Sequence, residues 1–429
     1  MFVSFARAPM GGARRRLAAG AIASCLLAAG AAAASARAAV SPVSWSPVSW
    51  SPVSWSPVSW AVDIGVPIYN AARTSGSRAY LTTAQDKGAN VFAIDAATGK
   101  VLWRFASGGS IPMPPSVGDT QVFVANDIGD THYMRALDAK TGALVWKYTR
   151  SEPPQCMCSH QATLDAGLLF AQTDGHSLYA FAPVGSAPSR RLWAFKGDGA
   201  RLTHPVAADG VVAFGSADHD LYGLDARTGA LRWTAKTGYA FVARPALAGG
   251  LIVAGNRGGV VHAYDARTGR SVWSFATGGA IDTRAVAERE GAGGGLVFVA
   301  SEDRSVYALD ARTGRQVWRA RMADYSQFAP VPYGNDLLVA NRAGDLVALA
   351  QATGKVVWTR RLRGTPFSAP LAWHGAVVVK VGDHAIASYD AASGRALWRY
   401  RTRAVVTAPR PAGDVLVAGL SSGRIVGLR

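Results

Sequence analysis

The stretch Asp310-Ala-Arg-Thr-Gly-Arg-Gln-Val-Trp318 follows the apolar run Val306-Tyr-Ala-Leu309, and related stretches recur along the chain. An aspartate carboxylate accepts hydrogen bonds from turn amides, and a glycine adopts positive φ, so the pattern predicts a β-hairpin. The second strand of each hairpin carries a tryptophan four residues after the glycine. Related segments end at Trp103, Trp146, Trp193, Trp233, Trp273, Trp358 and Trp398, although the turn is lost before Trp193.

The spacing of these tryptophans predicts a repeated four-stranded unit. From Trp103 to Trp398, successive tryptophans lie 40 to 47 residues apart. Each interval accommodates four short strands with their turns, and no helical pattern interrupts them. A large flat side chain at one fixed strand position fills the same gap between neighbouring sheets. We therefore expect an all-β chain that forms a single β-propeller with these eight tryptophans as its docking residues.

The two ends of the repeat region are expected to close the ring. Residues 405–428 contain three strand patterns but no tryptophan strand, and the segment Trp60-Ala-Val-Asp-Ile64 has the pattern of an outer strand. Pairing the N-terminal strand with the C-terminal strands would remove two open sheet edges. The propeller then has nine blades, or eight if these two segments do not form a blade.

Composition supports a folded chain with a basic surface. Of the 429 residues, 49% are apolar and 17% are charged, and the formal net charge is +17. A basic balance favours attraction to anionic surfaces and acidic partners. Lysine and arginine are, however, distributed over repeated turns such as Asp225-Ala-Arg227-Thr-Gly229. This distribution predicts a solvated rim and no dedicated nucleic-acid site.

The N-terminal 60 residues differ from the repeats. Residues 1–38 contain Arg14-Arg15-Arg16, an apolar run and small residues around Arg37, which is typical of a secretory signal peptide. Residues 39–59 consist mostly of Ser-Pro-Val-Ser-Trp copies, in which regular prolines forbid a helix and predict an extended tether. The propeller is assigned to residues 60–429.

Two other interpretations of the apolar run stay open. It could remain as a membrane helix, although it is rich in alanine and glycine and a polar uncharged tract follows it. Ile22-Ala-Ser-Cys25 also resembles the cleavage box of bacterial lipoproteins, in which case Cys25 would carry a lipid anchor.

The repeat Asp-x-x-Thr-Gly-x-x-x-Trp resembles the tryptophan-docking motif of the PQQ-type (quinoprotein-like) β-propeller repeat family, over about residues 60–429. That family includes PQQ-dependent alcohol dehydrogenases and non-catalytic propellers of outer-membrane protein assembly (BamB-like). The dehydrogenase branch implies long insertions with calcium ligands, a catalytic aspartate and a disulfide between adjacent cysteines. Units of 40 to 47 residues leave little room for such insertions, and Cys156 and Cys158 are not adjacent.

The resemblance therefore implies an exported, non-catalytic scaffold for protein–protein interaction in the cell envelope. We expect a periplasmic monomer, associated with the outer membrane, whose partners are envelope proteins such as the outer-membrane assembly machinery. No catalytic residue is assigned and no cofactor is expected. The alternative is a small PQQ-binding quinoprotein with calcium, which would be dehydrogenase-like, or an anion-binding propeller.

One set of residues favours the alternative. The residue before the recurrent proline of each first strand is expected to face the central channel. Four consecutive units place Gln161, His204, Arg244 and Arg284 there, and the next three place Ala329, Ala369 and Ala408. Arginine binds carboxylate or phosphate through two hydrogen bonds, so this crescent predicts an anion or cofactor site, and PQQ carries carboxylates. The competing interpretation is that these polar residues only contact water in the channel.

A second candidate site is Cys156-Met-Cys158-Ser-His160, which offers thiolate and imidazole ligands within five residues. Such ligands suit copper(I) or zinc. In an exported protein two cysteines more often oxidise, although a disulfide that spans one residue of an extended strand would be strained. A disulfide or inert thiols, redox lability and metal binding therefore all remain open.

Overall fold

The Asp-x-x-Thr-Gly turn joins neighbouring strands in a hairpin that depends on its aspartate and its glycine. Between β24 (Ser305–Asp310) and β25 (Gln316–Arg321), Asp310 Oδ1 accepts hydrogen bonds of 2.8 Å from the Thr313 amide and 2.6 Å from the Thr313 hydroxyl. Gly314 has a φ of 71°, in the left-handed region. The hydrogen bonds from Thr313 lower the pKa of Asp310. The same contacts recur in the turns that begin at Asp95, Asp138, Asp225, Asp265 and Asp390.

The computed structural model describes residues 57–128, 131–150, 162–172, 177–182, 191–197, 201–287 and 295–429. These residues all lie in the second of the two units into which the chain divides, Ser54–Arg429. Their regular elements are all strands, and they include no helix that could cross a membrane.

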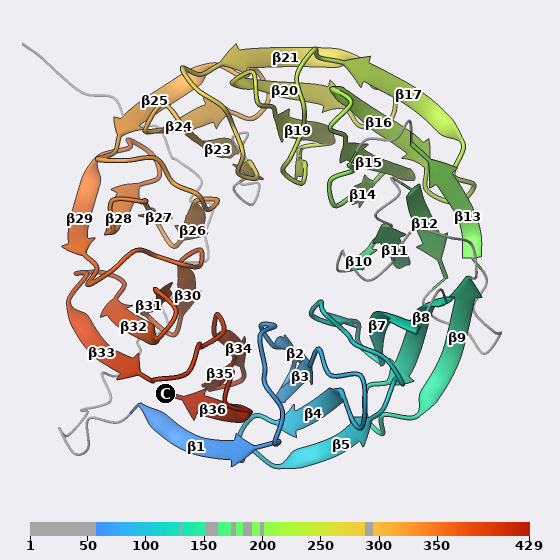
Figure 1. Cartoon of the computed structure of the whole chain (residues 1–429). Helices are drawn as coiled ribbons and strands as arrows, with labels where there is room; N and C mark the ends of the chain where they lie inside the picture. Colours follow the sequence, from blue (N-terminus) through green and yellow to red (C-terminus); the bar gives the residue numbers. More distant parts are fainter. Residues whose placement is uncertain are drawn as a thin grey trace, which may run out of the picture. The chain divides into compact units, whose positions relative to one another are not determined.

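The described residues form nine antiparallel four-stranded sheets, and each sheet is one blade of a propeller (Figure 1). The first blade contains β2 (Arg73–Ser75), β3 (Arg78–Thr82), β4 (Val91–Asp95) and β5 (Val101–Phe105). The second contains β6 (Ser116–Val117), β7 (Gln121–Ile128), β8 (Thr131–Asp138) and β9 (Leu144–Arg150). The third contains β10 (Thr163–Asp165), β11 (Leu168–Gln172), β12 (Ser177–Phe181) and β13 (Arg191–Lys196). The fourth blade contains β14 (Val206–Ala208), β15 (Val211–Gly215), β16 (Asp220–Asp225) and β17 (Leu231–Lys236). The fifth contains β18 (Ala246–Ala248), β19 (Leu251–Gly255), β20 (Val260–Asp265) and β21 (Ser271–Ala276). The sixth contains β22 (Val286–Ala287), β23 (Leu296–Ser301), β24 and β25.

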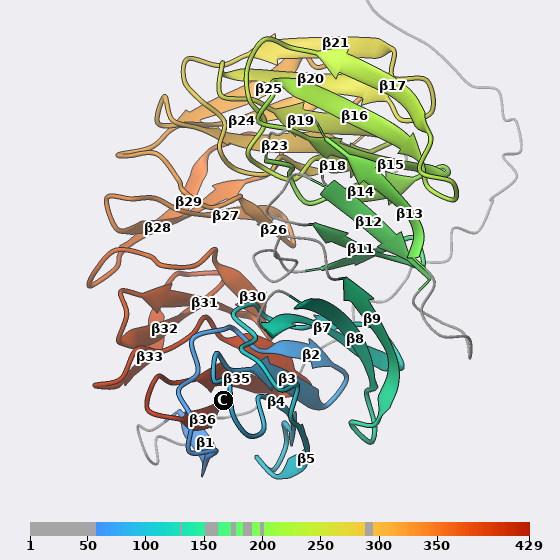
Figure 2. The same cartoon turned by 45° about the vertical axis from the view of Figure 1, so that its right-hand side comes forward.

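The last three blades complete the ring, which Figure 2 shows from a second direction. The seventh blade contains β26 (Val331–Tyr333), β27 (Asp336–Ala340), β28 (Asp345–Ala350) and β29 (Val356–Arg361). The eighth contains β30 (Leu371–Trp373), β31 (Ala376–Val381), β32 (Ala385–Asp390) and β33 (Ala396–Arg401). The ninth contains β34 (Arg410–Ala412), β35 (Val415–Gly419), β36 (Arg424–Leu428) and β1 (Val58–Asp63). In each blade the short first strand lies toward the centre and the tryptophan strand lies outside (Figure 1).

The N-terminal strand closes the ring. β1 pairs antiparallel with β36, and Trp60 lies opposite Gly427 in this pairing. In Figure 1 the blue β1 lies beside the red β36. This result confirms the predicted closure by the two ends of the repeat region, and the number of blades is nine. The strand begins at Val58, inside the last Ser-Pro-Val-Ser-Trp copy.

Tryptophans of the outer strands pack on the turn of the next blade. Trp273 Nε1 donates a hydrogen bond of 2.9 Å to Ala311 O, and a Cβ on Gly314 would lie 2.6 Å from the Trp273 ring. The glycine is therefore required for close approach as well as for positive φ. Equivalent indole hydrogen bonds extend from Trp60, Trp103, Trp193, Trp233, Trp318 and Trp358 to the following blade.

The apolar core lies between blades. One cluster combines Tyr80 and Trp103 of the first blade with Val122 and Leu137 of the second. Two further predicted docking residues take part in such clusters: Trp146 packs among residues of the second and third blades, and the half-buried Trp398 packs against residues of the ninth. The core is thus a series of interblade layers, as expected for repeats that bury their faces against one another.

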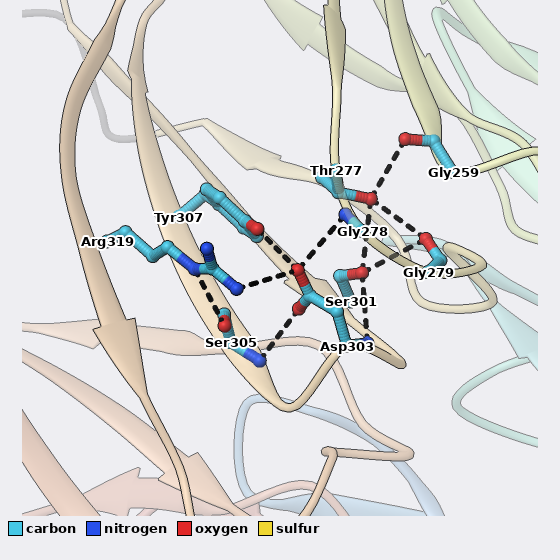
Figure 3. Close-up of polar contacts among 9 residues, drawn as sticks. All are labelled: Gly259, Thr277, Gly278, Gly279, Ser301, Asp303, Ser305, Tyr307 and Arg319. Atoms are coloured by element: carbon cyan, nitrogen blue, oxygen red, sulfur yellow. Dashed lines mark hydrogen bonds and ion pairs between the residues drawn. The ribbon is translucent and has the colours of Figure 1, made fainter.

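A partly buried polar cluster joins the fifth blade to the sixth (Figure 3). Asp303, whose side chain is 7% exposed, lies in the turn between β23 and β24 and accepts hydrogen bonds from Tyr307, from the Gly278 amide at 3.1 Å and from Arg319 at 3.2 Å. Gly278 belongs to the connection from β21 to β22. Burial raises the pKa of Asp303, but these hydrogen bonds and the charge of Arg319 outweigh it, so the pKa lies below its ordinary value.

Candidate functional site

The inner strands carry the predicted channel residues at their N-terminal ends. His204, Arg244 and Arg284 each lie two residues before the start of β14, β18 or β22, respectively. Figure 1 places these short strands around the centre of the ring. The three residues therefore hold comparable positions at the start of successive inner strands.

Arg244 is the best-anchored of the three predicted residues that the structure describes. Its Nη2 donates to Asp165 Oδ2 at 2.6 Å, and the side chains of Arg244 and Asp165 are 30% and 24% exposed. Asp165 also accepts a hydrogen bond of 3.3 Å from the Ala207 amide. Burial lowers the pKa of Arg244, Asp165 acts in the opposite direction, and the nearby charge of Arg284 lowers it further. Arg244 Nε is buried and has no hydrogen-bond partner among the described residues.

His204 and Arg284 lie on either side of Arg244. His204 is half-buried, and its Nδ1 lies 3.3 Å from the hydroxyl of Thr163 on β10. Arg284 is exposed. The structure thus brings His204 and Arg244 to one cavity and Arg244 and Arg284 to a second.

The two cavities adjoin at Arg244. The larger has a volume of about 440 Å³ and extends across the first strands of several blades. It is lined by Arg73, Thr74, Ser116, Val117, Ala162, Thr163, Leu164, His204 and Arg244. The smaller, of about 250 Å³, is lined by Asp165, Val206, Arg244, Pro245, Ala246, Leu247, Arg284, Ala285, Val286 and Ala287. Asp165 is the single carboxylate among these described lining residues.

The sequence interpretation missed two arginines of this region. Arg73 and Arg410 are the first residues of β2 and β34, the inner strands of the first and ninth blades. Burial lowers the pKa of Arg73 to about 10, and the charge of Arg410 lowers it as well. Burial also lowers the pKa of Arg410, whose Nε is buried with no partner among the described residues.

The reason for the omission is the alignment on proline. Arg73 follows Ala71-Ala72, a unit without the recurrent proline, and Arg410 lies after Pro409, two positions beyond Ala408. Both arginines are therefore displaced by two residues from the predicted series. Residues two apart on a strand point to the same side, so this displacement keeps them on the channel face. Alignment on the first residue of each inner strand would have included them.

Four predicted site residues lie outside the described part of the chain. These are Gln161 of the channel series and the ligand candidates Cys156, Cys158 and His160. Their roles stay predictions.

The described channel residues are poor in ligands for calcium. Calcium takes six to eight oxygen ligands, several of them carboxylates. The described lining offers Asp165, which already binds Arg244, and no group of three His, Cys, Asp or Glu side chains among the described residues is arranged to hold a metal ion.

A second candidate site is the outer edge of the blades. Each outer strand is the terminal strand of its sheet. In seven blades it exposes aliphatic residues next to the tryptophan position: Leu102, Leu144, Val145, Leu192, Leu231, Val272, Val317, Val356 and Val357. Open edges that combine unpaired backbone groups with apolar side chains are suited to bind another polypeptide.

Comparison with known proteins identifies the repeat family. The family model described as outer membrane protein assembly factor BamB matches residues 55–187, 184–301, 257–335 and 302–429. The outer membrane protein assembly factor BamB of Moranella endobia (strain PCIT) is 30% identical over 132 residues, which are 28% of this chain and 32% of that protein. The chain thus spans about a third of the length of this curated relative.

Two solved structures resemble the propeller. The crystal structure of BamB from Moraxella catarrhalis has a TM-score of 0.58 and 19% identity, over 73% of this chain and 93% of that one. A europium-containing methanol dehydrogenase has a TM-score of 0.52 and 13% identity, over 79% of this chain and 85% of that one. At these identities the likeness shows the fold alone, which a scaffold and an enzyme share.

Proposed function

The chain belongs to the outer membrane protein assembly factor BamB family, and we propose that it is an exported, non-catalytic scaffold that binds other proteins of the cell envelope during outer-membrane protein assembly. The observation that carries the proposal is the open, aliphatic outer edge of seven blades. A ring of similar edges offers one partner, or several, a choice of equivalent docking positions.

The edge of the seventh blade is the strongest docking candidate. β29 begins with Val356 and Val357, which are 59% and 48% exposed, and ends with Arg360 and Arg361. A strand that pairs with this edge would satisfy its free backbone groups and remove the two valines from water. Arg360 donates hydrogen bonds to the carbonyl oxygens of Gly394 and Ser393, and Arg361 pairs with Asp345 at 2.8 Å. The Arg361 side chain is still 70% exposed, so the edge favours partners with acidic residues near the paired strand.

Site-specific crosslinking tests the proposal. A photo-crosslinking residue at Val357 is expected to capture a protein of the outer-membrane assembly machinery in cells, and the added substitution Val356→Asp, in a folded variant, is expected to abolish the product. The matched control is the same crosslinker at Asp414, whose side chain is 85% exposed in a turn between inner strands. Equal products from both positions, or none from Val357, would argue against the outer edge as the docking site.

Export and anchoring are part of the same proposal. Residues 1–38 and Cys25 lie outside the described residues. Mass spectrometry of the mature protein separates cleavage near Ala39 from lipidation at Cys25, and Cys25→Ala is expected to release the protein from membranes only in the second case. Detection of the intact N-terminus in the cytoplasm would contradict export.

A further inference from the structure

We propose that the larger channel cavity is a binding site for a small organic oxyanion that carries at least two carboxylate or phosphate groups. The site extends along the inner strands of the first to the fifth blade and is built mainly by Arg73, Thr163, His204 and Arg244. This inference is separate from the scaffold function, because the outer edges and the channel use different strands.

Among the described residues that line the two cavities, cationic side chains outnumber carboxylates. Three guanidinium groups, those of Arg73, Arg244 and Arg284, line the two adjoining cavities together with the single carboxylate of Asp165. Arg410 lies close enough to Arg73 to lower its pKa further. Positive charges that share a low-dielectric concave surface raise the local concentration of anions and strengthen their binding.

Burial opposes the charge of the arginines in this region. Arg73, Arg244 and Arg410 all have pKa values lowered by burial, which shows that their surroundings disfavour the charged form. The Nε atom of Arg244, which lines both cavities, is also buried with no partner among the described residues. An oxyanion in the cavity would offset this cost through charge-assisted hydrogen bonds.

The volume of the larger cavity and the residues that line it indicate which kind of anion fits. A volume of about 440 Å³ falls in the range of small-molecule sites and exceeds what one inorganic ion needs. Thr74 and Thr163 supply hydroxyl groups, and His204 supplies an imidazole that contacts Thr163. Val117 and Leu164 provide an apolar part of the wall. This combination fits an organic molecule with two charged ends better than a bare ion.

Calorimetric titration of the purified protein with citrate and with pyrophosphate tests the site, at constant ionic strength adjusted with sodium chloride. We expect saturable binding of at least one probe with a Kd below about 1 mM. Binding of citrate alone identifies a carboxylate site, and binding of pyrophosphate alone identifies a phosphate site. The absence of saturable heat for both probes up to about 10 mM would overturn the proposal.

Variants locate the binding. Arg73→Gln and Arg244→Gln are each expected to weaken binding about tenfold or more, because each removes a charge-assisted contact. The matched control is Arg257→Gln, which breaks an exposed ion pair with Asp282, lines neither cavity and is expected to leave binding unchanged. Equal affinity of the wild type and both channel variants would overturn the site. If Arg73→Gln does not fold, Arg73→Lys and Arg410→Gln decide, with reduced affinity expected for both.

Discussion

The indole Nε1 of Trp60 donates a hydrogen bond of 2.8 Å to the carbonyl oxygen of Ala96, and this contact joins the ninth blade to the first. The same ring lies against Gly99, where an added Cβ would be 2.5 Å from Trp60 Cε3. Trp60 also lies on the strand that pairs with β36. One residue thus contributes both to the sheet and to the interblade contact that close the ring.

Replacing Trp60 is therefore expected to weaken the closure. Trp60→Ala should lower the free energy of unfolding by about 3 kcal/mol, the cost of removing a large packed aromatic side chain. Denaturant unfolding followed by tryptophan fluorescence and circular dichroism measures the change. The matched control is Trp50→Ala, the equivalent position two copies earlier in the predicted tether. Equal stability of the two variants would contradict the role of Trp60.

Two turn glycines distinguish the cost of backbone strain from the cost of a steric clash when a side chain is added. Gly314 and Gly76 both have positive φ, 71° and 56°, but a Cβ would meet the Trp273 ring at 2.6 Å in the first case and nothing within 4 Å in the second. Gly76→Ala should cost about 1 kcal/mol from backbone strain alone. Gly314→Ala should cost roughly 2 kcal/mol more, because the indole must move. Equal melting temperatures of the two variants would contradict tight packing of Trp273 on Gly314.

The Asp303 cluster predicts a pH dependence of stability. Because its folded-state pKa is lowered, the carboxylate stabilises the fold above its unfolded-state pKa of about 4, and the contribution is lost as pH falls through the folded-state value. Asp303→Asn should melt at a lower temperature than the wild type at pH 7, with a loss of roughly 2 kcal/mol. The difference should shrink below about pH 4. A difference that stays constant down to about pH 3 would show that the charge of Asp303 is not responsible.

The channel lining predicts the response to PQQ and calcium. PQQ carries carboxylates and is a reasonable probe of the oxyanion cavity, but the described residues do not provide a calcium site. Any PQQ binding, measured by cofactor absorbance, should therefore be the same with calcium and with a chelator. Calcium-dependent binding followed by dye-linked alcohol oxidation would favour the quinoprotein alternative.

Most of the fold was predictable because each blade of a propeller repeats the same local structure. The turn at Asp310 and Gly314 and the docking of Trp273 depend on contacts between adjacent units, so the pattern appears in the sequence at a regular spacing. The pattern around Trp60 indicated an outer strand that could close the ring. The number of blades could not be predicted, because it depends on whether β1 and β36 pair, and the pattern of either strand alone does not determine this.

The candidate site was predictable only in part. His204 and Arg244 were found because a proline marks their position, whereas Arg73 and Arg410 lie two residues beyond the comparable positions. The ion pair between Arg244 and Asp165 joins residues 79 positions apart and links the inner strands of the fifth and third blades. Such contacts depend on how the blades are arranged in the ring, and no local sequence pattern specifies that arrangement.

Complementation of a deletion strain tests the central claim most directly. The wild-type gene should restore the amounts of outer-membrane β-barrel proteins, measured by quantitative mass spectrometry of the outer membrane. A folded Val356→Asp, Val357→Asp double variant should fail to restore them, whereas a folded Arg73→Gln variant should succeed. Full restoration by the outer-edge variant, or β-barrel amounts that do not change on deletion, would contradict a scaffold that acts through its outer edges.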